Sequence, residues 1–171
     1  MVGPRPPRES ADDASDAFDL ERDDSRYTIT TFLSSLVPAA LARRAVAVSI
    51  RTDRDVYARD DPVAITVDFK NRLPIPVSIP TPSQRRWGWT VDGDLEASDE
   101  RRYVPDRPAV FRFRGGERKQ VRFTWHGRFE RTAGGRRESV VPDPGEYELR
   151  AFIATGEETY RPSDATTIRL E

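Results

Sequence analysis

The sequence predicts an all-β fold: an antiparallel β-sandwich of seven or eight strands, with a short N-terminal helix and a disordered acidic tail. After residue 45, apolar and polar residues alternate with a period of two in many short segments, which is typical of strands that pack on one face. Turn residues separate these segments, and the chain has 14 prolines and 10 glycines. The hydrophobic fraction of 36% suits one two-layer core rather than a large α/β core.

Composition also limits the chemistry and the location of the protein. The chain has no cysteine, which excludes disulfides and thiolate metal sites. The first residues lack the apolar stretch of a secretory signal. No segment approaches the ~20 apolar residues of a membrane span. We therefore expect a soluble, cytoplasmic protein that has no membrane partner.

The N-terminal quarter of the chain divides into two predicted parts. Residues 1–26 are acidic, contain prolines and have few aromatics, so we expect a disordered tail. Residues 27–44 are predicted to be an amphipathic helical segment. Pro38 interrupts it, which predicts a break at Val37 and a second helical turn with Pro38 in its first position. The apolar stripe comprises Ile29, Phe32, Leu33, Leu36, Val37, Ala40 and Leu41.

Residues 45–171 are predicted to form the sandwich domain, with one apolar and one polar face on each strand. The third apolar segment carries Pro74, Pro76 and Pro80 on its other face, which predicts an edge strand because proline cannot donate to a ladder. Tyr147 follows a turn, and we expect its hydroxyl to anchor a corner of the sandwich. The predicted strands are Val46–Ile50, Val63–Phe69, Leu73–Ile79, Trp87–Val91, Ala109–Phe113, Val121–Trp125, Tyr147–Ile153 and Ile168–Leu170.

The order of several motifs is similar to that of a known family. The strand VAITVDFKN is followed by WGWTVDG, VFRF, the Gly-Gly-Glu turn at 115–117, a strand with Phe123 and Trp125, and the turn Pro144-Gly145-x-Tyr147. In this order they resemble the BsuPI-type intracellular proteinase inhibitors, a small Ig-like family, over residues 45–170.

The resemblance implies an Ig-like sandwich that inhibits an intracellular serine protease, such as a subtilisin-like enzyme. It carries over no inhibitory residues. The sequence departs from the family in two places. Trp87 and Trp89 precede Asp92-Gly93, whereas the family usually has a tryptophan after its Asp-x-x-Gly turn. Residues 1–44 are an addition to the family's domain.

The sequence offers little for catalysis or metal binding. His126 is the only histidine and should lie on the wet face of its strand. A catalytic relay needs a histidine poised between a serine and an acid, and no Gly-x-Ser-x-Gly elbow is present. The acids of loop 53–61 alternate with arginines and lack the glycine of a calcium loop. We also expect the acids of 92–100 to be solvated. We therefore predict no catalytic residue, no metal ligand and no cofactor.

Two loops are candidate contacts for a protein partner, because binding residues concentrate on loops of rigid scaffolds. Residues 127–145 are predicted to be a flexible connection around Gly134-Gly135. The loop 81–86 is predicted to be stiffer, because Pro80 and Pro82 restrict its backbone. The predicted partner-binding residues are Arg85, Arg86, Arg128, Arg131, Arg136 and Arg137.

Two alternative functions stay open at this point. The protein could be a general protein-interaction or assembly module that uses the N-terminal helix as its contact. Alternatively, an arginine-rich sheet face could bind a polyanion, although arginines on a wet face also cover it with their stems. The aromatics of these strands alternate to the opposite face and cannot stack on bases, so nucleic acid is disfavoured as a partner. The stripe comprises Arg112, Arg114, Arg118, Lys119, Arg122 and Arg128.

Overall fold

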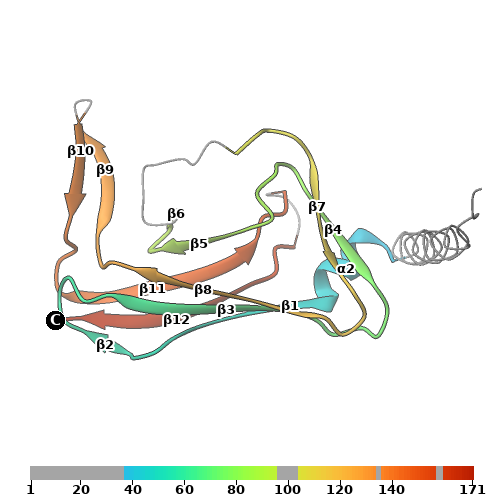
Figure 1. Ribbon diagram of the computed structural model, residues 1–171, viewed down its shortest axis with the longest axis horizontal. Coiled ribbons are helices and arrows are strands. Elements are labelled where there is room, and N and C mark those ends of the chain that lie inside the picture. Colours follow the sequence, from blue (N-terminus) through green and yellow to red (C-terminus); the bar gives the residue numbers. More distant parts are fainter. Residues whose placement is uncertain (1–36, 96–103, 134–135, 157–159) are drawn as a thin grey trace, which may run out of the picture.

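The computed structural model describes residues 37–95, 104–133, 136–156 and 160–171 (Figure 1). The predicted tail and residues 27–36 of the predicted helical segment lie outside the described residues. The described chain is a β-sandwich, which confirms the predicted fold class. Helix α2 (Ala39–Ala45) precedes the first strand. None of the helices in the described part of the chain combines the length and the apolar character of a membrane span.

Two sheets form the layers of the sandwich. One has three antiparallel strands in the order β1-β3-β8, and the other has five strands in the order β2-β12-β11-β5-β6. In the larger sheet only β2 runs parallel to its neighbour, β12. The smaller sheet comprises β1 (Val46–Thr52), β3 (Val63–Asn71) and β8 (Arg118–Trp125). The larger comprises β2 (Val56–Tyr57), β12 (Ser163–Leu170), β11 (Gly145–Ile153), β5 (Trp87–Val91) and β6 (Asp94–Leu95).

Two further strand pairs lie at opposite ends of the molecule (Figure 1). β4 (Val77–Thr81) pairs with β7 (Ala109–Phe113) at the end that α2 covers. β9 (Phe129–Ala133) pairs with β10 (Arg136–Val140) at the end where the C-terminus lies. β4 therefore has one partner strand, as its prolines predict, and Pro80 lies within it.

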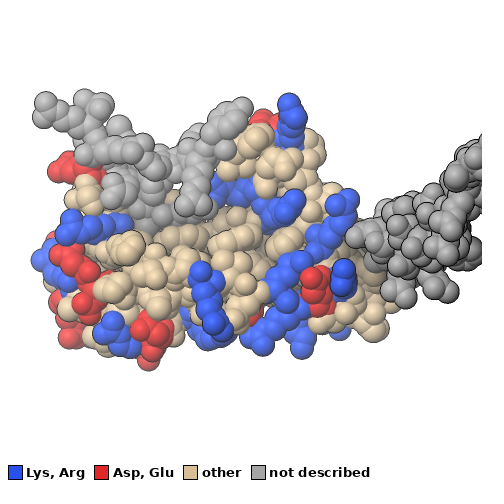
Figure 2. All heavy atoms as spheres, viewed as in Figure 1, with Lys and Arg blue, Asp and Glu red and all other residues tan. Residues whose placement is uncertain are grey.

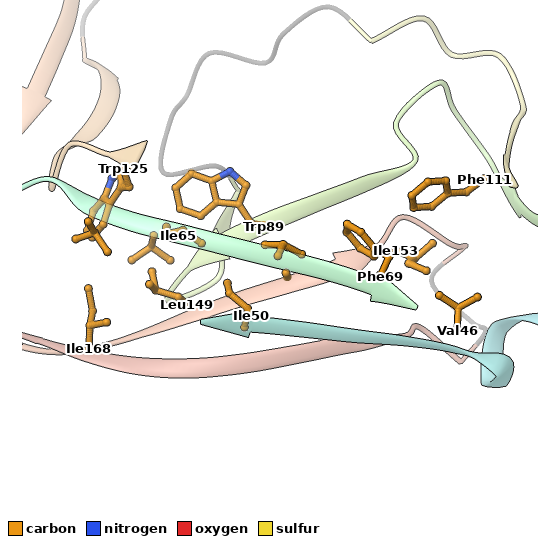
Figure 3. Close-up of a cluster of buried hydrophobic side chains, with 14 of the residues drawn as sticks. Val46, Ile50, Ile65, Phe69, Trp89, Phe111, Trp125, Leu149, Ile153 and Ile168 are labelled. Carbon is orange, nitrogen blue, oxygen red and sulfur yellow. The ribbon is translucent and has the colours of Figure 1, made fainter. Parts of the chain in front are cut away.

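The core lies between the two main sheets, and the alternation in the sequence selects it. Val63, Ile65, Val67 and Phe69 of β3 are each at most 1% exposed. They face Leu149, Ala151 and Ile153 of β11, which are also fully buried. Figure 3 shows the labelled side chains filling this space from Phe111 at one end to Trp125 at the other. All eight predicted strands exist in the structure; Trp87–Val91 and Ala109–Phe113 have the predicted ends, and the others differ at one or both ends.

The third predicted strand is only partly correct. It begins at Val77, and residues 72–76 are irregular. The buried side chain of Asn71 organises this segment: its Nδ2 donates to the carbonyls of Ile75 and Arg114, both at 2.8 Å, and its Oδ1 accepts from the Leu73 amide at 3.0 Å. Backbone groups that a ladder would have paired are thus paired by one side chain instead.

The predicted helical stripe is only partly correct in its described part: Val37 packs against the core, but Ala40 and Leu41 do not. Ala40 and Leu41 are exposed, Leu41 by 51%, whereas Ala42 and Ala45 are buried. Pro38 is the N-cap of α2 rather than its first residue, and the helix continues four residues beyond Leu41. Small residues face the protein because α2 packs closely on β4 and β1. A stripe defined by the largest apolar side chains therefore selects the wrong side of this turn.

The predicted flexible connection at 127–145 is also wrong, because most of it is the β9–β10 hairpin. Phe129 is 7% exposed and belongs to the core, and Val140 packs against the core. The side-chain nitrogen of Trp125 donates to the Arg128 carbonyl at 2.9 Å, which fixes the start of the hairpin. The aromatic residue at 129 was the signal in the sequence for an ordered segment.

Candidate functional site

The outer face of the five-stranded sheet carries an apolar patch at one end. Phe152 alternates with the core residues Ala151 and Ile153, so its ring lies on the solvent side of the sheet. It stands opposite Gly88 in the register of β11 and β5. A Cβ on Gly88 would lie 2.9 Å from Cζ of Phe152 and 3.4 Å from Cδ1 of Leu95. Glycine at 88 therefore makes room for the ring, which is only 8% exposed.

A shallow groove of about 630 Å³ opens over this patch. Its walls come from the loop before β5, from the turn and strand β6 after it, and from the segment that follows β11. The apolar lining residues are Pro82, Leu95, Phe152 and Ala154. The polar lining residues that bear on its chemistry are Ser83, Arg85, Thr155 and Arg161.

Two of the polar lining residues, Thr155 and Arg161, are candidate ligand contacts. Thr155 is 4% exposed, and its Oγ1 is buried without a hydrogen-bond partner among the described residues. A buried hydroxyl usually has a partner, so an unpaired one at a groove is a candidate contact. The guanidinium carbon of Arg161 lies 4.9 Å from the centre of the Phe152 ring. This cation–π contact holds the charge over the groove.

The loop 81–86 forms one rim of the groove and is held by hydrogen bonds along its length. The Thr81 hydroxyl donates to the Ser83 carbonyl at 2.9 Å, and the Arg85 amide donates to the Ser83 hydroxyl at 3.3 Å. The backbone amide of Gln84 donates to the Pro105 carbonyl at 3.3 Å. At the end of the loop, the Ala154 amide donates to the Arg86 carbonyl at 3.0 Å. These bonds support the predicted stiffness of the loop.

The structure separates the six arginines predicted to bind a partner into two groups. Arg85 lines the groove, and Arg86 is exposed beside it. Arg128 is exposed at the opposite end of the sandwich, 3.0 Å from the Asp60 carboxylate. Arg131, Arg136 and Arg137 belong to the β9–β10 hairpin near Arg128, and their side chains lie outside the described residues. The groups lie near opposite ends of β11, whose nine residues span roughly 27 Å.

Sequence analysis missed Phe152, Thr155 and Arg161. A signal was present for the first of these, because an aromatic residue occupies an outward position in the alternation of β11. The glycine at 88 occupies the outward position opposite it. A large apolar side chain beside a glycine on the wet face of a sheet predicts a local patch. Nothing in the sequence indicated that Thr155 and Arg161 lie beside it.

The predicted arginine stripe is partly neutralised by acids. Arg118 on β8 donates two hydrogen bonds to Asp68, at 2.9 and 2.8 Å. Lys119 contacts Glu117 at 2.8 Å. Arg112 and Arg122 are exposed, and the right half of the described surface in Figure 2 is predominantly basic. Polyanion binding by this face therefore stays a prediction.

The acids of loop 53–61 have structural contacts. Asp53 accepts hydrogen bonds from the Tyr57 hydroxyl at 2.6 Å and from the Ala64 amide at 3.2 Å. The Tyr57 bond, with smaller contributions from backbone donors, lowers the pKa of Asp53. Asp61 lies 3.5 Å from Arg54. Within the part of the chain that the structure describes, no three His, Asp or Glu side chains gather as a metal site. His126 is exposed just after β8, as predicted.

A family model of proteins of unknown function, DUF7974, matches residues 34–171 of the chain. The search of curated proteins found no match. The matched family is not the BsuPI-type inhibitors, so the resemblance to those inhibitors stays a prediction.

Several solved structures are similar to this one. The CARDB domain of a Pyrococcus furiosus protein, crystallised with di-metal ions, is 15% identical and matches 73% of this chain and 91% of that chain, with a TM-score of 0.44. A sporulation control protein of Bacillus subtilis is 17% identical, and the match covers 74% of this chain and 49% of that chain, with a TM-score of 0.45. An alkylpurine DNA glycosylase of Pseudomonas fluorescens, bound to DNA with an abasic-site analogue, is 12% identical. The match covers 78% of this chain and 32% of that chain, with a TM-score of 0.44. The chain thus spans about a third of the glycosylase and half of the sporulation protein.

Proposed function

The chain belongs to the DUF7974 family, and from this premise we propose that it is a non-enzymatic protein-binding module that contacts its partner through the loop 81–86. The observation that supports this proposal most is the hydrogen bonding of the loop, which holds an exposed arginine, Arg86, in place. A preorganised loop loses little conformational entropy on binding, so more of its contact energy appears as affinity.

The finer form of the proposal is inhibition of a serine protease, as the resemblance to the BsuPI-type inhibitors implies. An inhibitor that occupies an active site as a poor substrate must present an exposed, rigid segment. The loop 81–86 meets that requirement, with Pro82, Gln84 and Arg86 exposed and the residues between them half-buried. The target would be a subtilisin-like intracellular protease that accepts an arginine at the contact.

The test is a titration of the purified chain against such a protease, following cleavage of a peptide substrate. We expect stoichiometric loss of activity while the chain stays intact. Arg86→Ala should weaken inhibition about thirtyfold, as loss of a central arginine contact does. Arg128→Ala is the control, because this arginine is also exposed but lies at the opposite end, and it should inhibit like the native chain.

Two results would contradict the proposal at different levels. Absence of inhibition at a large excess, with cleavage of the chain in the loop 81–86, would remove protease inhibition. Equal weakening by Arg86→Ala and Arg128→Ala would remove this loop as the contact while leaving inhibition itself standing.

A further inference from the structure

We propose that the groove on the outer face of the five-stranded sheet binds a carboxylate that is joined to an apolar body. The ligand is either a free organic acid or the C-terminal residue of a peptide. This inference goes beyond the proposed function, because it concerns a ligand held on the sheet face and needs no protease. It depends on three features of the groove: an unpaired hydroxyl, a placed guanidinium and an apolar floor.

The hydroxyl of Thr155 supplies a donor whose natural partner is absent from the described protein. Thr155 is 4% exposed, and its Oγ1 has no hydrogen-bond partner. Leaving such a group unpaired in a buried position costs stability, and a ligand oxygen would recover the lost hydrogen bond. Thr155 lines the groove, and its Oγ1 is inaccessible in the structure, so a rotation of the side chain would bring the hydroxyl to a ligand oxygen there.

The guanidinium of Arg161 supplies the charge. It lies over the Phe152 ring at 4.9 Å, a contact that fixes its position while it keeps its N–H donors. A planar guanidinium can donate two parallel hydrogen bonds to a carboxylate, which makes it the preferred partner for that group. No aspartate or glutamate is among the described residues that line the groove. The charged residues among the described lining are Arg85 and Arg161, and their charge favours an anion.

The apolar floor of the groove, formed by Phe152 and Leu95, favours an anion that carries an apolar body. Phe152 and Leu95 lie side by side over Gly88, where a Cβ would come within 3.4 Å of both side chains. Leu95 is 38% exposed, so it leaves apolar surface for a ligand to cover. The groove volume of about 630 Å³ lies within the range of small-ligand sites. An inorganic anion would leave this surface uncovered.

The experiment is isothermal titration of the full chain at pH 7 with three probes. These are 3-phenylpropionate, the acetylated tripeptide Gly-Gly-Phe with a free carboxylate, and the same tripeptide as its amide. We expect at least one carboxylate to bind and the amide not to bind. Binding of 3-phenylpropionate indicates a free acid as the ligand, whereas binding of the tripeptide alone indicates a peptide C-terminus.

Variants distinguish the groove from any other basic surface. Arg161→Gln should weaken carboxylate binding about tenfold or more, as expected for loss of a charged hydrogen bond. Thr155→Val keeps the shape of the side chain and removes the hydroxyl, and should weaken binding about fivefold. Arg150→Gln is the control, because Arg150 lies on β11 outside the groove, paired with Glu148 at 3.0 Å, and should leave binding unchanged.

Three outcomes would overturn the inference. Neither carboxylate binds at millimolar concentration, the amide binds as tightly as the acid, or Arg150→Gln weakens binding as much as Arg161→Gln. Thermal unfolding of each variant verifies that it is folded at the titration temperature. None of these outcomes affects protease inhibition, which depends on Arg86 and is measured separately.

Discussion

At the scale of single residues, a buried carboxylate links the three-stranded sheet across its outer face. The side chain of Asp68 on β3 is 5% exposed. It accepts hydrogen bonds from Arg118 and Gln120 on β8, and from Arg51 on β1 at 2.6 Å. The Arg118 bonds, with those of Arg51 and Gln120, outweigh burial and hold the pKa of Asp68 well below its ordinary range.

Asp68→Asn should therefore lower the free energy of unfolding at pH 7 by about 2 kcal/mol, because charged donors lose their acceptor. The pKa of Asp68 is depressed in the folded state, so its stabilisation is present above the ordinary value of 3.8 and is lost as the pH falls below it. The difference between the native chain and the variant should thus be constant from pH 7 to pH 5 and should shrink by pH 3. Urea unfolding at each pH measures this.

The control for that experiment is Glu148→Gln, which breaks the exposed pair with Arg150. Exposed pairs contribute little, so we expect a change below about 0.5 kcal/mol at pH 7. A pH-independent effect of Asp68→Asn would contradict the role of the charge and leave only its packing.

Tyr57 organises the acidic loop in a similar way. It is 1% exposed, and its hydroxyl donates to Asp53 at 2.6 Å while accepting from the Arg54 amide at 3.0 Å. Burial, followed by the hydrogen bond to Asp53, raises the pKa of Tyr57. The hydroxyl thus ties the start of the loop, at Asp53 and Arg54, to a buried residue of β2.

Tyr57→Phe should lower the free energy of unfolding by about 1–3 kcal/mol, because it leaves a backbone donor and a carboxylate without their partner. Tyr147→Phe is the comparison. Its hydroxyl donates to the Asp143 carbonyl at 2.8 Å, which confirms the predicted corner, but at an exposed site. We expect at most about 1 kcal/mol there. Chemical denaturation of both variants measures the two losses in unfolding free energy. An equal loss in both variants would contradict the larger role of the Tyr57 hydroxyl.

At the scale of elements, a side chain of one sheet protects the edge strand of the other sheet. β1 is the edge strand of its sheet and lies near β12 of the other sheet without a backbone ladder between them. Asp164 on β12 bridges them, since its carboxylate accepts a hydrogen bond from the Ile50 amide at 3.0 Å. An acidic side chain at this position satisfies an edge donor and discourages pairing with another chain.

Asp164→Ala should expose this edge. We expect a loss of about 1 kcal/mol of unfolding free energy and faster hydrogen exchange at the Ile50 amide. Asp143→Ala is the control, because the Asp143 side chain is 98% exposed. Unchanged exchange at Ile50 in the first variant would show that the carboxylate does not protect the edge.

At the scale of the whole molecule, α2 is part of the sandwich rather than a separate element. Ala42 is fully buried and Ala45 is 6% exposed, and both belong to the core cluster. The boundary predicted at residue 45 thus cuts through buried structure. Interaction through the N-terminal segment stays a prediction, and a deletion that tests it should end before α2.

A comparison of two shortened chains checks this boundary. A chain that begins at residue 46 should be less stable than one that begins at residue 37 by about 2 kcal/mol, from the apolar surface that α2 buries. Thermal unfolding of both chains measures the difference. Equal stability would show that α2 is dispensable to the fold.

Alternation in the sequence was enough to predict eight strands and the main core residues, because alternation along a strand decides which side chains can face another sheet. It did not predict β2, β6 or the β9–β10 hairpin. The sequence also predicted the β4 edge from its prolines and the corner at Tyr147. It also predicted a stiff loop at 81–86, whereas contact of its Arg85 and Arg86 with a partner stays a prediction.

The contacts between distant parts of the chain became visible in the folded structure alone. The alternation of apolar and polar residues does not predict that small residues of α2 face the core, or that the segment after Phe129 pairs as a hairpin. Thr155 and Arg161 lie beside Phe152 because the residues next to them are held there: the Ala154 amide donates to Arg86 of the loop before β5, and the Ile153 amide donates to the Pro162 carbonyl. Contacts of this kind depend on the pairing of distant strands, and a local pattern contains no information about the partner that a strand will find.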